Sequence, residues 1–308
     1  MNNRQKRMSL LMAVVVLVLL LSGCGGKGND LDGQIEKTSE YLYNEVVTPA
    51  ISSTGGDWAV KGIADSGLEV EDGYFESYYD NVRAIVKAKK GVLSEDHFTE
   101  YARVALALDS IGKDAKNVEG YDLIKEMDDY KILTDQGVNA AAYALIASNI
   151  HGEKLQCEDK LIKYIIDTVD NGKFASPEGD EYFVDYIAMS ISGLSFYSDR
   201  EEVKAFLDKH IEGLSKVQKE DGSFGNCEST AETISALSQN GIKVTEDPRF
   251  SKDGKTPLDG LMLYAGKDGG FLHQLDKKGV DTMATERALV ALNSIKLCNE
   301  GKRLYAAE

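Results

Sequence analysis

Residues 218–244, QKEDGSFGNCESTAETISALSQNGIKV, decide the fold. They begin with a glycine–aromatic turn at Gly222-Ser223-Phe224, continue through a polar start into a run rich in small residues, and stop at Gly241. Ser and Thr are favoured where a helix begins, and Gly is favoured just after a helix ends. This stretch therefore predicts a tight turn followed by one short helix built largely from small residues.

Weaker copies of this unit recur along the chain. Residues 62–70 align with residues 236–244, with small residue on small residue and glycine on glycine. Similar helix ends follow at intervals of about one helix pair, around Leu108, Leu145, Leu194 and Leu292. A sequence unit repeated at such intervals predicts a two-helix structure used several times.

Helical periodicity gives twelve expected segments, at 33–47, 57–67, 75–90, 97–111, 119–129, 137–149, 158–170, 182–196, 200–217, 229–240, 256–264 and 282–296. The even-numbered segments are rich in Ala, Gly and Ser, whereas the odd-numbered ones are amphipathic and charged. Helices that are apolar nearly all round are buried, and helices with one charged face line the outside. We therefore expect an all-α fold, an (α/α)6 toroid of six inner and six outer helices.

The N-terminus predicts export. Three basic residues precede an apolar run at 10–21, which is shorter than the roughly 20 residues a membrane-spanning helix needs. Leu21-Ser22-Gly23-Cys24 then resembles the lipobox of bacterial lipoproteins. That resemblance implies removal of a signal peptide at 1–23 and a lipid on Cys24. The glycine-rich composition that follows predicts a flexible tether at 24–32, and the helix pattern places the toroid domain at 33–308. Two or more acyl chains would anchor the protein to the outer face of the cytoplasmic membrane. An ordinary cleaved signal peptide is the alternative.

Charge restricts the partners. Cleavage before Cys24 removes three basic residues and no acidic ones, so the formal net charge changes from −16 to −19. Such a surface disfavours nucleic acid and anionic lipid. The remaining cysteines, Cys157, Cys227 and Cys298, form neither a disulfide framework nor a CxxC metal signature, and at most one pair can bridge.

The turn at residues 218–224 resembles the QW motif of the terpenoid cyclase and protein prenyltransferase superfamily, with Phe224 where tryptophan is usual. Further segments resemble the prenyltransferase-like repeats of bacterial surface proteins, which are similar to the barrel of the cobalamin carriers transcobalamin and intrinsic factor. These segments are Trp58-Ala59-Val60, Tyr101-Ala102-Arg103, Gly137-Val138-Asn139, Ser229-Thr230-Ala231 and Met283-Ala284-Thr285-Glu286. The resemblance covers about residues 40–300. It implies the toroid but not one activity, because this scaffold carries cyclases, transferases and binding proteins.

The catalytic motifs of those families are not matched. The cyclase DxDD motif is approached only at Glu126-Met127-Asp128-Asp129, which we interpret as a solvated helix end. The prenyltransferase zinc site needs a cysteine and a histidine, and this chain has Gly270 and Ala284 at the corresponding positions. We therefore expect no catalytic residues, no metal and no cofactor.

A ligand site is expected in the funnel where the inner helices begin, because concave pockets with a few polar groups are the usual binding sites. Its aromatic and acidic residues suit a neutral or cationic small molecule, a glycan or a corrinoid, or else an envelope protein. A carbohydrate-active enzyme on the same barrel, hydrolase or lyase, is the alternative. Several candidates could instead cap helices or fill the core. The candidates are Trp58, Tyr101, Arg103, Asn139, Tyr143, Tyr182, Asp185, Tyr186, Glu228, Thr230, Asp281, Thr285 and Glu286.

Overall fold

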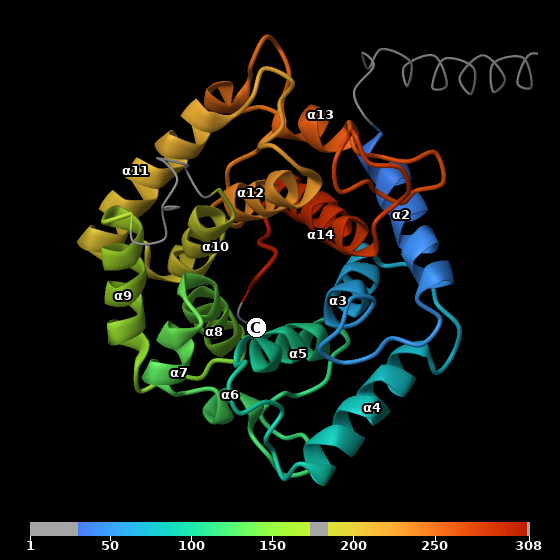
Figure 1. Cartoon of the computed structure of the whole chain (residues 1–308), viewed down its shortest axis with the longest axis vertical. Coiled ribbons are helices and arrows are strands. Elements are labelled where there is room, and N and C mark those ends of the chain that lie inside the picture. Colours follow the sequence, from blue (N-terminus) through green and yellow to red (C-terminus); the bar gives the residue numbers. More distant parts are fainter. Residues whose placement is uncertain (1–29, 173–183, 307–308) are drawn as a thin grey trace, which may run out of the picture. The chain divides into compact units, whose positions relative to one another are not determined.

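A computed structural model describes residues 30–172 and 184–306. Every regular element in those two ranges is helical: thirteen α-helices and two 3-10 helices, with isolated β-bridges but no strand. The chain from Leu31 onward forms one compact unit, drawn in colour in Figure 1. The predicted all-α class is therefore confirmed. The predicted signal peptide at 1–23 and most of the tether lie outside the described residues.

Six helices pack against one another as a closed series, and we call them the core helices. Each contacts the next one along the chain, and the last contacts the first (Figure 1). At this closing contact the Asn293 amide donates a hydrogen bond to the Gly62 carbonyl oxygen at 2.9 Å. The core helices are α3 (Asp57–Ser66), α5 (Thr99–Ser110), α8 (Val138–Ile150), α10 (Val184–Leu194), α12 (Cys227–Gln239) and α14 (Thr282–Asn299).

Small residues let the core helices approach closely. A Cβ atom added at Gly193 of α10 would lie 2.9 Å from the Ala142 Cα atom of α8, closer than side-chain atoms tolerate. A Cβ at Gly62 of α3 would likewise lie 3.1 Å from the Leu289 side chain of α14. The Ala, Gly and Ser content that distinguished these segments in the sequence is thus the condition for their mutual packing.

The flanking helices bury one face each. They are α2 (Leu31–Glu45), α4 (Tyr74–Ala88), α9 (Glu158–Asp170), α11 (Glu201–Val217) and α13 (Pro257–Met262). Helix α2 packs on α3 and α14, α9 on α8 and α10, α11 on α10, and α13 on α12. In α9 the buried face is a stripe at Leu161, Ile165 and Val169, with the charged residues opposite. Two 3-10 helices, η1 (Ser195–Tyr197) and η2 (Pro248–Phe250), lie in the connections.

The single outer helix predicted at 119–129 is wrong. Two short helices, α6 (Leu123–Glu126) and α7 (Tyr130–Asp135), replace it. The Asp122 carboxylate accepts hydrogen bonds from the amides of Ile124 and Lys125, and Asp129 accepts one from Ile132. Each aspartate therefore begins its own helix as an N-cap. The acidic run at 126–129 marks a break between helices rather than one helix end.

The glycine–aromatic turn has the same hydrogen bonds in two copies. In the first copy the Phe224 amide donates to the Thr230 hydroxyl at 3.0 Å, and that hydroxyl donates to the Asn226 carbonyl oxygen at 2.7 Å. In the second copy the Phe271 amide donates to the Thr285 hydroxyl at 2.8 Å. Both phenylalanines are buried. One threonine near the start of a core helix thus holds the preceding aromatic turn against that helix.

Candidate functional site

Four side chains from four core helices meet in what we call the central cluster: Trp58, Tyr143, Glu232 and Arg287. The Arg287 guanidinium lies 3.9 Å from the centre of the Trp58 ring, and the Tyr143 ring meets Trp58 edge-on at 5.4 Å. The Tyr143 hydroxyl donates to Glu232 Oε1 at 3.0 Å and accepts from Arg287 Nη1 at 3.3 Å. Glu232 and Arg287 form an ion pair at 3.6 Å. Two predicted candidates, Trp58 and Tyr143, therefore lie together.

Burial governs the protonation of this cluster. It raises the pKa of Glu232, and the positive charge of Arg287 offsets part of that rise. Burial alone would lower the pKa of Arg287, but Tyr143 and Glu232 raise it above its ordinary range, so the guanidinium stays charged. A buried ion pair contributes little net stability, whereas removing one partner costs about 3–5 kcal/mol. The pair therefore acts mainly as a constraint on how the helices meet.

Beside the central cluster lies a second buried carboxylate, Asp57, at the start of α3. It accepts hydrogen bonds from the Tyr78 hydroxyl at 2.8 Å and from the Ser52 amide at 3.1 Å. Arg103 Nε lies 3.7 Å from Asp57 Oδ2. Burial raises the pKa of Asp57 to about 6, although Tyr78 and Arg103 act in the opposite direction. Asp57 thus ties a flanking helix and the loop before α3 to the core.

Glu286 is a third buried carboxyl group. Its Oε1 accepts a hydrogen bond from the Gly55 amide at 2.6 Å, and the residue is 2% exposed. Burial raises its pKa to about 7, while that amide and the charge of Arg287 act against the rise and Asp57 adds to it. At neutral pH this carboxyl is therefore divided between its protonated and ionised forms.

Four predicted candidates carry a buried polar atom without a hydrogen-bond partner among the described residues. These atoms are Trp58 Nε1, Arg103 Nε, Asn139 Oδ1 and Asp185 Oδ1, and they come from α3, α5, α8 and α10. Three of the four residues stand at the second position of their helix, close to its N-terminal end. An unmatched buried polar atom costs about 1–3 kcal/mol. A bound molecule or water that supplies the missing partners would recover that cost.

Other candidates at the same helix ends are more exposed. Glu228, the second residue of α12, pairs with His273 Nδ1 at 2.8 Å. Tyr186 is 37% exposed near the start of α10, and Met283, the second residue of α14, is 51% exposed. These side chains offer both charge and apolar surface near the N-terminal ends of the core helices.

The remaining described candidates have structural contacts. Tyr101 is 1% exposed and its hydroxyl accepts from the Leu93 amide at 2.9 Å. Asp281 caps α14 by accepting from the Ala284 amide at 2.9 Å. Thr230 and Thr285 hold the aromatic turns, as described above. Two candidates, Cys24 and Tyr182, lie outside the described residues.

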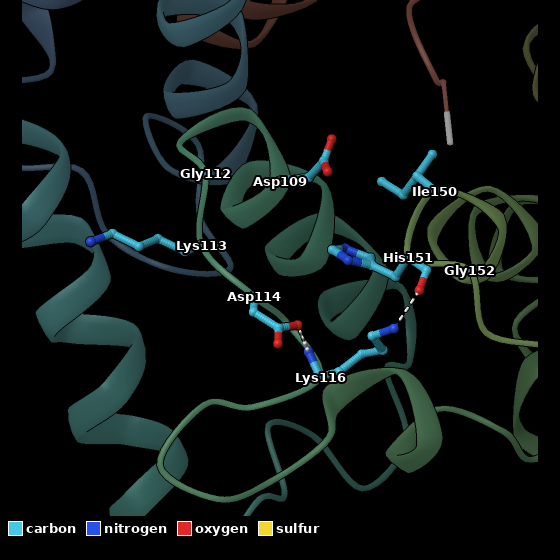
Figure 2. Close-up of a pocket in the computed structure, with 8 residues that line it drawn as sticks. All are labelled: Asp109, Gly112, Lys113, Asp114, Lys116, Ile150, His151 and Gly152. Atoms are coloured by element: carbon cyan, nitrogen blue, oxygen red, sulfur yellow. Dashed lines mark hydrogen bonds between the residues drawn. The ribbon is translucent and has the colours of Figure 1, made fainter. Parts of the chain in front are cut away.

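A cavity of about 370 Å³ lies at the opposite, C-terminal ends of α5 and α8 (Figure 2). Its cationic groups are already paired: Lys113 with Glu76 at 2.8 Å, and Lys116 with the His151 carbonyl oxygen at 2.7 Å. The lining holds none of the predicted candidates: Asp109, Gly112, Lys113, Asp114, Lys116, Ile150, His151 and Gly152. This cavity therefore offers a ligand fewer unpaired polar groups than the N-terminal ends of the core helices do.

Metal-binding geometry is not found in the described ranges: no three His, Cys, Asp or Glu side chains are placed to hold an ion. Cys157, Cys227 and Cys298 are free thiols. Burial raises the pKa of Cys227 well above its ordinary value, which makes it a poor nucleophile. Among the described helices, none combines the length and apolarity that crossing a bilayer requires.

Comparison of the chain with protein-family models and with curated proteins finds no match.

Sequence reasoning missed three residues of this site, Asp57, Glu232 and Arg287. Their signal was a charge inside a segment otherwise rich in small residues, since Glu232 follows Ser229-Thr230-Ala231 and Arg287 follows Glu286 in the last core helix. Charged side chains are almost never fully buried unless they are paired. A charge on a helix expected to be buried all round therefore points to a buried pair or a binding site.

Proposed function

We propose that the described helices form an (α/α)6 toroid. The support is the closed series of contacts among the six core helices together with the flanking helices packed outside them. The two short helices α6 and α7 would take the place of one outer helix, because α6 packs on α5 and α8, and α7 on α8 and α9. The result would be six helix pairs whose inner members share one N-terminal end.

We further propose that this toroid belongs to an exported lipoprotein, anchored through Cys24 to the outer face of the cytoplasmic membrane. The support comes from the sequence: the basic N-terminus, the apolar run at 10–21 and Leu21-Ser22-Gly23-Cys24. The tether predicted at 24–32 would then hold the folded unit away from the membrane, although α2 already begins at Leu31 and so shortens it.

The function we propose is non-catalytic binding of a small organic molecule at the N-terminal ends of the core helices. One observation carries it: four core helices each bring a buried polar atom without a hydrogen-bond partner to that end, from Trp58, Arg103, Asn139 and Asp185, and of these described atoms only Arg103 Nε has an ion-pair contact, with Asp57 at 3.7 Å. Preorganised donors and acceptors in a shielded space are what a binding site requires. Five further described residues, Ser52, Ser192, Gln218, Ser238 and Asn293, also carry such an atom, so the distinguishing feature is that four neighbouring core helices each contribute one.

Charge indicates the class of ligand. Asp57, Asp185, Glu232 and Glu286 supply four carboxyl groups, against the two guanidinium groups of Arg103 and Arg287. Asp57 and Glu232 are paired with the two guanidinium groups and Glu286 is only partly ionised at neutral pH, so the excess of carboxyl groups leaves a modest negative charge. A neutral or cationic molecule is favoured, which includes a glycan, a corrinoid or the polar side chain of an envelope protein.

The test is a thermal-shift screen of the purified chain against neutral oligosaccharides, organic amines and cobalamin. A ligand at free concentration c that binds only the folded state stabilises it by RT ln(1 + c/Kd), so the melting temperature rises with the logarithm of the ligand concentration once this exceeds Kd. The affinity of a ligand found in the screen should fall about tenfold in Asn139→Ala and in Asp185→Asn, a loss of about 1.4 kcal/mol of binding free energy. The matched control is Lys116→Ala at the opposite end, which should keep full affinity. A ligand whose affinity is unchanged in both Asn139→Ala and Asp185→Asn would contradict the proposal. A screen in which no ligand of any class binds would contradict it as well.

A second candidate function, a glycan hydrolase, is favoured by one observation. A general acid needs a carboxyl group that stays partly protonated near neutral pH, and burial raises the pKa of Glu286 to about 7. Incubation with polysaccharides would separate the two functions. Cleavage that disappears in Glu286→Gln would support catalysis, whereas binding without products would leave the non-catalytic proposal in place.

A further inference from the structure

The segment after α14 turns back among the core helices. Helix α14 ends at Asn299, and Gly301 two residues later has a φ of 74°, a left-handed conformation that glycine adopts readily. The Lys302 amide donates to the Leu297 carbonyl oxygen at 2.8 Å, which closes the turn. Leu304 and Tyr305 are then 8% and 3% exposed. In Figure 1 this red segment runs from α14 into the space between the core helices.

One side chain holds the backbone of Tyr305 from both sides. The Gln239 amide donates to the Tyr305 carbonyl oxygen at 2.9 Å, and the Tyr305 amide donates to Gln239 Oε1 at 2.9 Å. Gln239 is the last residue of α12 and is fully buried. An amide side chain can supply a donor and an acceptor together, whereas a carboxylate or an apolar side chain cannot. Tyr305 is therefore fixed in place and does not merely fill space.

The Tyr305 ring lies under the central cluster. Lys61 Nζ of α3 is 5.3 Å from the ring centre, and Lys61 stands one helical turn after Trp58. Burial raises the pKa of the Tyr305 phenol well above its ordinary value; Tyr143 and Glu232 of the central cluster add to the rise, and Arg287 opposes it. Tyr305 thus approaches the cluster from the C-terminal half of the core helices, opposite to the end where the unmatched polar atoms gather.

We propose that Tyr305 forms the inner wall of the ligand site, so that the site is open at the N-terminal ends of the core helices and its depth is set by this one side chain. This inference rests on the proposed binding function. It makes Tyr305 a specificity-determining residue: a smaller residue at position 305 would lengthen the space available to a ligand.

The test uses Trp58, the one tryptophan of the chain, as a reporter, and acrylamide as the probe. Trp58 is 5% exposed, so its emission in the unaltered chain should be blue-shifted and weakly quenched. Tyr305→Ala should raise the acrylamide quenching constant several-fold and shift the emission to the red. Tyr305→Phe keeps the ring and should match the unaltered chain. Tyr164→Ala, which removes a tyrosine from the flanking helix α9, is the matched control and should have no effect.

If Tyr305→Ala fails to melt cooperatively, Tyr305→Leu replaces it and should give the same change to a smaller extent. A folded variant, Ala or Leu, with unchanged Trp58 quenching would overturn the inference. This outcome is independent of ligand, so it is distinct from a failure of the binding proposal. For a ligand found by the screen, equal affinity and equal size preference in Tyr305→Ala and the unaltered chain would overturn the inference while leaving the binding function intact.

Discussion

Charged residues inside the core helices are the features of this chain that packing does not explain. Glu232 and Glu286 are 6% and 2% exposed on helices otherwise built from small and apolar residues. Apolar residues of similar volume would often serve stability as well or better at such positions. In the binding function that we propose, these charges and the nearby polar atoms without hydrogen-bond partners would contact the ligand.

Substitution of Glu286 should alter how stability depends on pH. Its pKa is about 7 in the folded chain, above the 4.5 typical of a free glutamate. The stability gained from the bound proton is therefore complete below about pH 4.5 and is lost as pH rises through 7. From pH 5 to pH 8 the unaltered chain should lose about 2–3 kcal/mol of unfolding free energy through this group. Glu286→Gln, whose amide oxygen can still accept from Gly55, should lack that loss.

Denaturant unfolding at several pH values, compared between the two chains, measures this difference. The control is Glu246→Gln, an exposed carboxylate, which should leave the pH profile of the unaltered chain intact. Parallel profiles for the unaltered chain and Glu286→Gln would show that Glu286 is ionised in the folded state throughout.

Cys24 is the residue on which the proposed location depends. Cys24→Ser removes the thiol that would carry the lipid, so the variant should move from the membrane fraction to the soluble exported fraction and lose incorporation of labelled palmitate. Cys298→Ser, at a buried thiol in α14, should stay with the membrane. Membrane association that is equal in all three chains would contradict lipid anchoring.

At the scale of elements, helix starts could be predicted where a capping side chain marks them. Asp281 marks α14 in the sequence and caps it in the structure. The same rule, applied to Asp122 and Asp129, would have divided the segment at 119–129, but the charged periodicity of that segment concealed the break. At this segment the local caps and the longer periodic pattern predict different helix boundaries. Contacts such as the hydrogen bond from the Gln156 amide to Asp128 decide between them, and the sequence does not display such contacts.

The two threonine-held turns give a prediction at this scale. Thr285→Val keeps the shape of the side chain but removes the acceptor for the buried Phe271 amide. An unsatisfied buried donor costs about 1–3 kcal/mol, so the free energy of unfolding should fall by that amount. Thr230→Val should cost about as much, because Phe224 depends on it in the same way. Thr134→Val, at a half-buried position in α7 where the hydroxyl donates a hydrogen bond to the Tyr130 carbonyl oxygen of the same helix, should stay within about 0.5 kcal/mol.

Chemical denaturation of the three variants provides the measurement. Equal and small effects at positions 230, 285 and 134 would mean that the two turns are held by ring packing alone and that the repeat has no shared hydrogen-bonded unit.

At the scale of the whole molecule, the sequence predicted which helices are buried but not which side chains meet. Trp58, Asn139, Tyr143 and Asp185 were predicted from their place near helix starts, and that placement depends on local periodicity alone. The pairing of Arg287 with Glu232, and the return of Tyr305 among the core helices, join residues far apart in the chain. Such contacts depend on how the whole series of helices closes, which no local pattern encodes.

The central claim is that ligand binds among the core helices next to Trp58. The most direct test is the emission of this single tryptophan during titration with a ligand from the screen. We predict a saturable change at one ligand per chain, with about tenfold weaker affinity in Asp185→Asn and unchanged affinity in Lys116→Ala. Saturable binding, measured independently by calorimetry, that leaves Trp58 emission unchanged and Asp185→Asn unaffected would contradict the account.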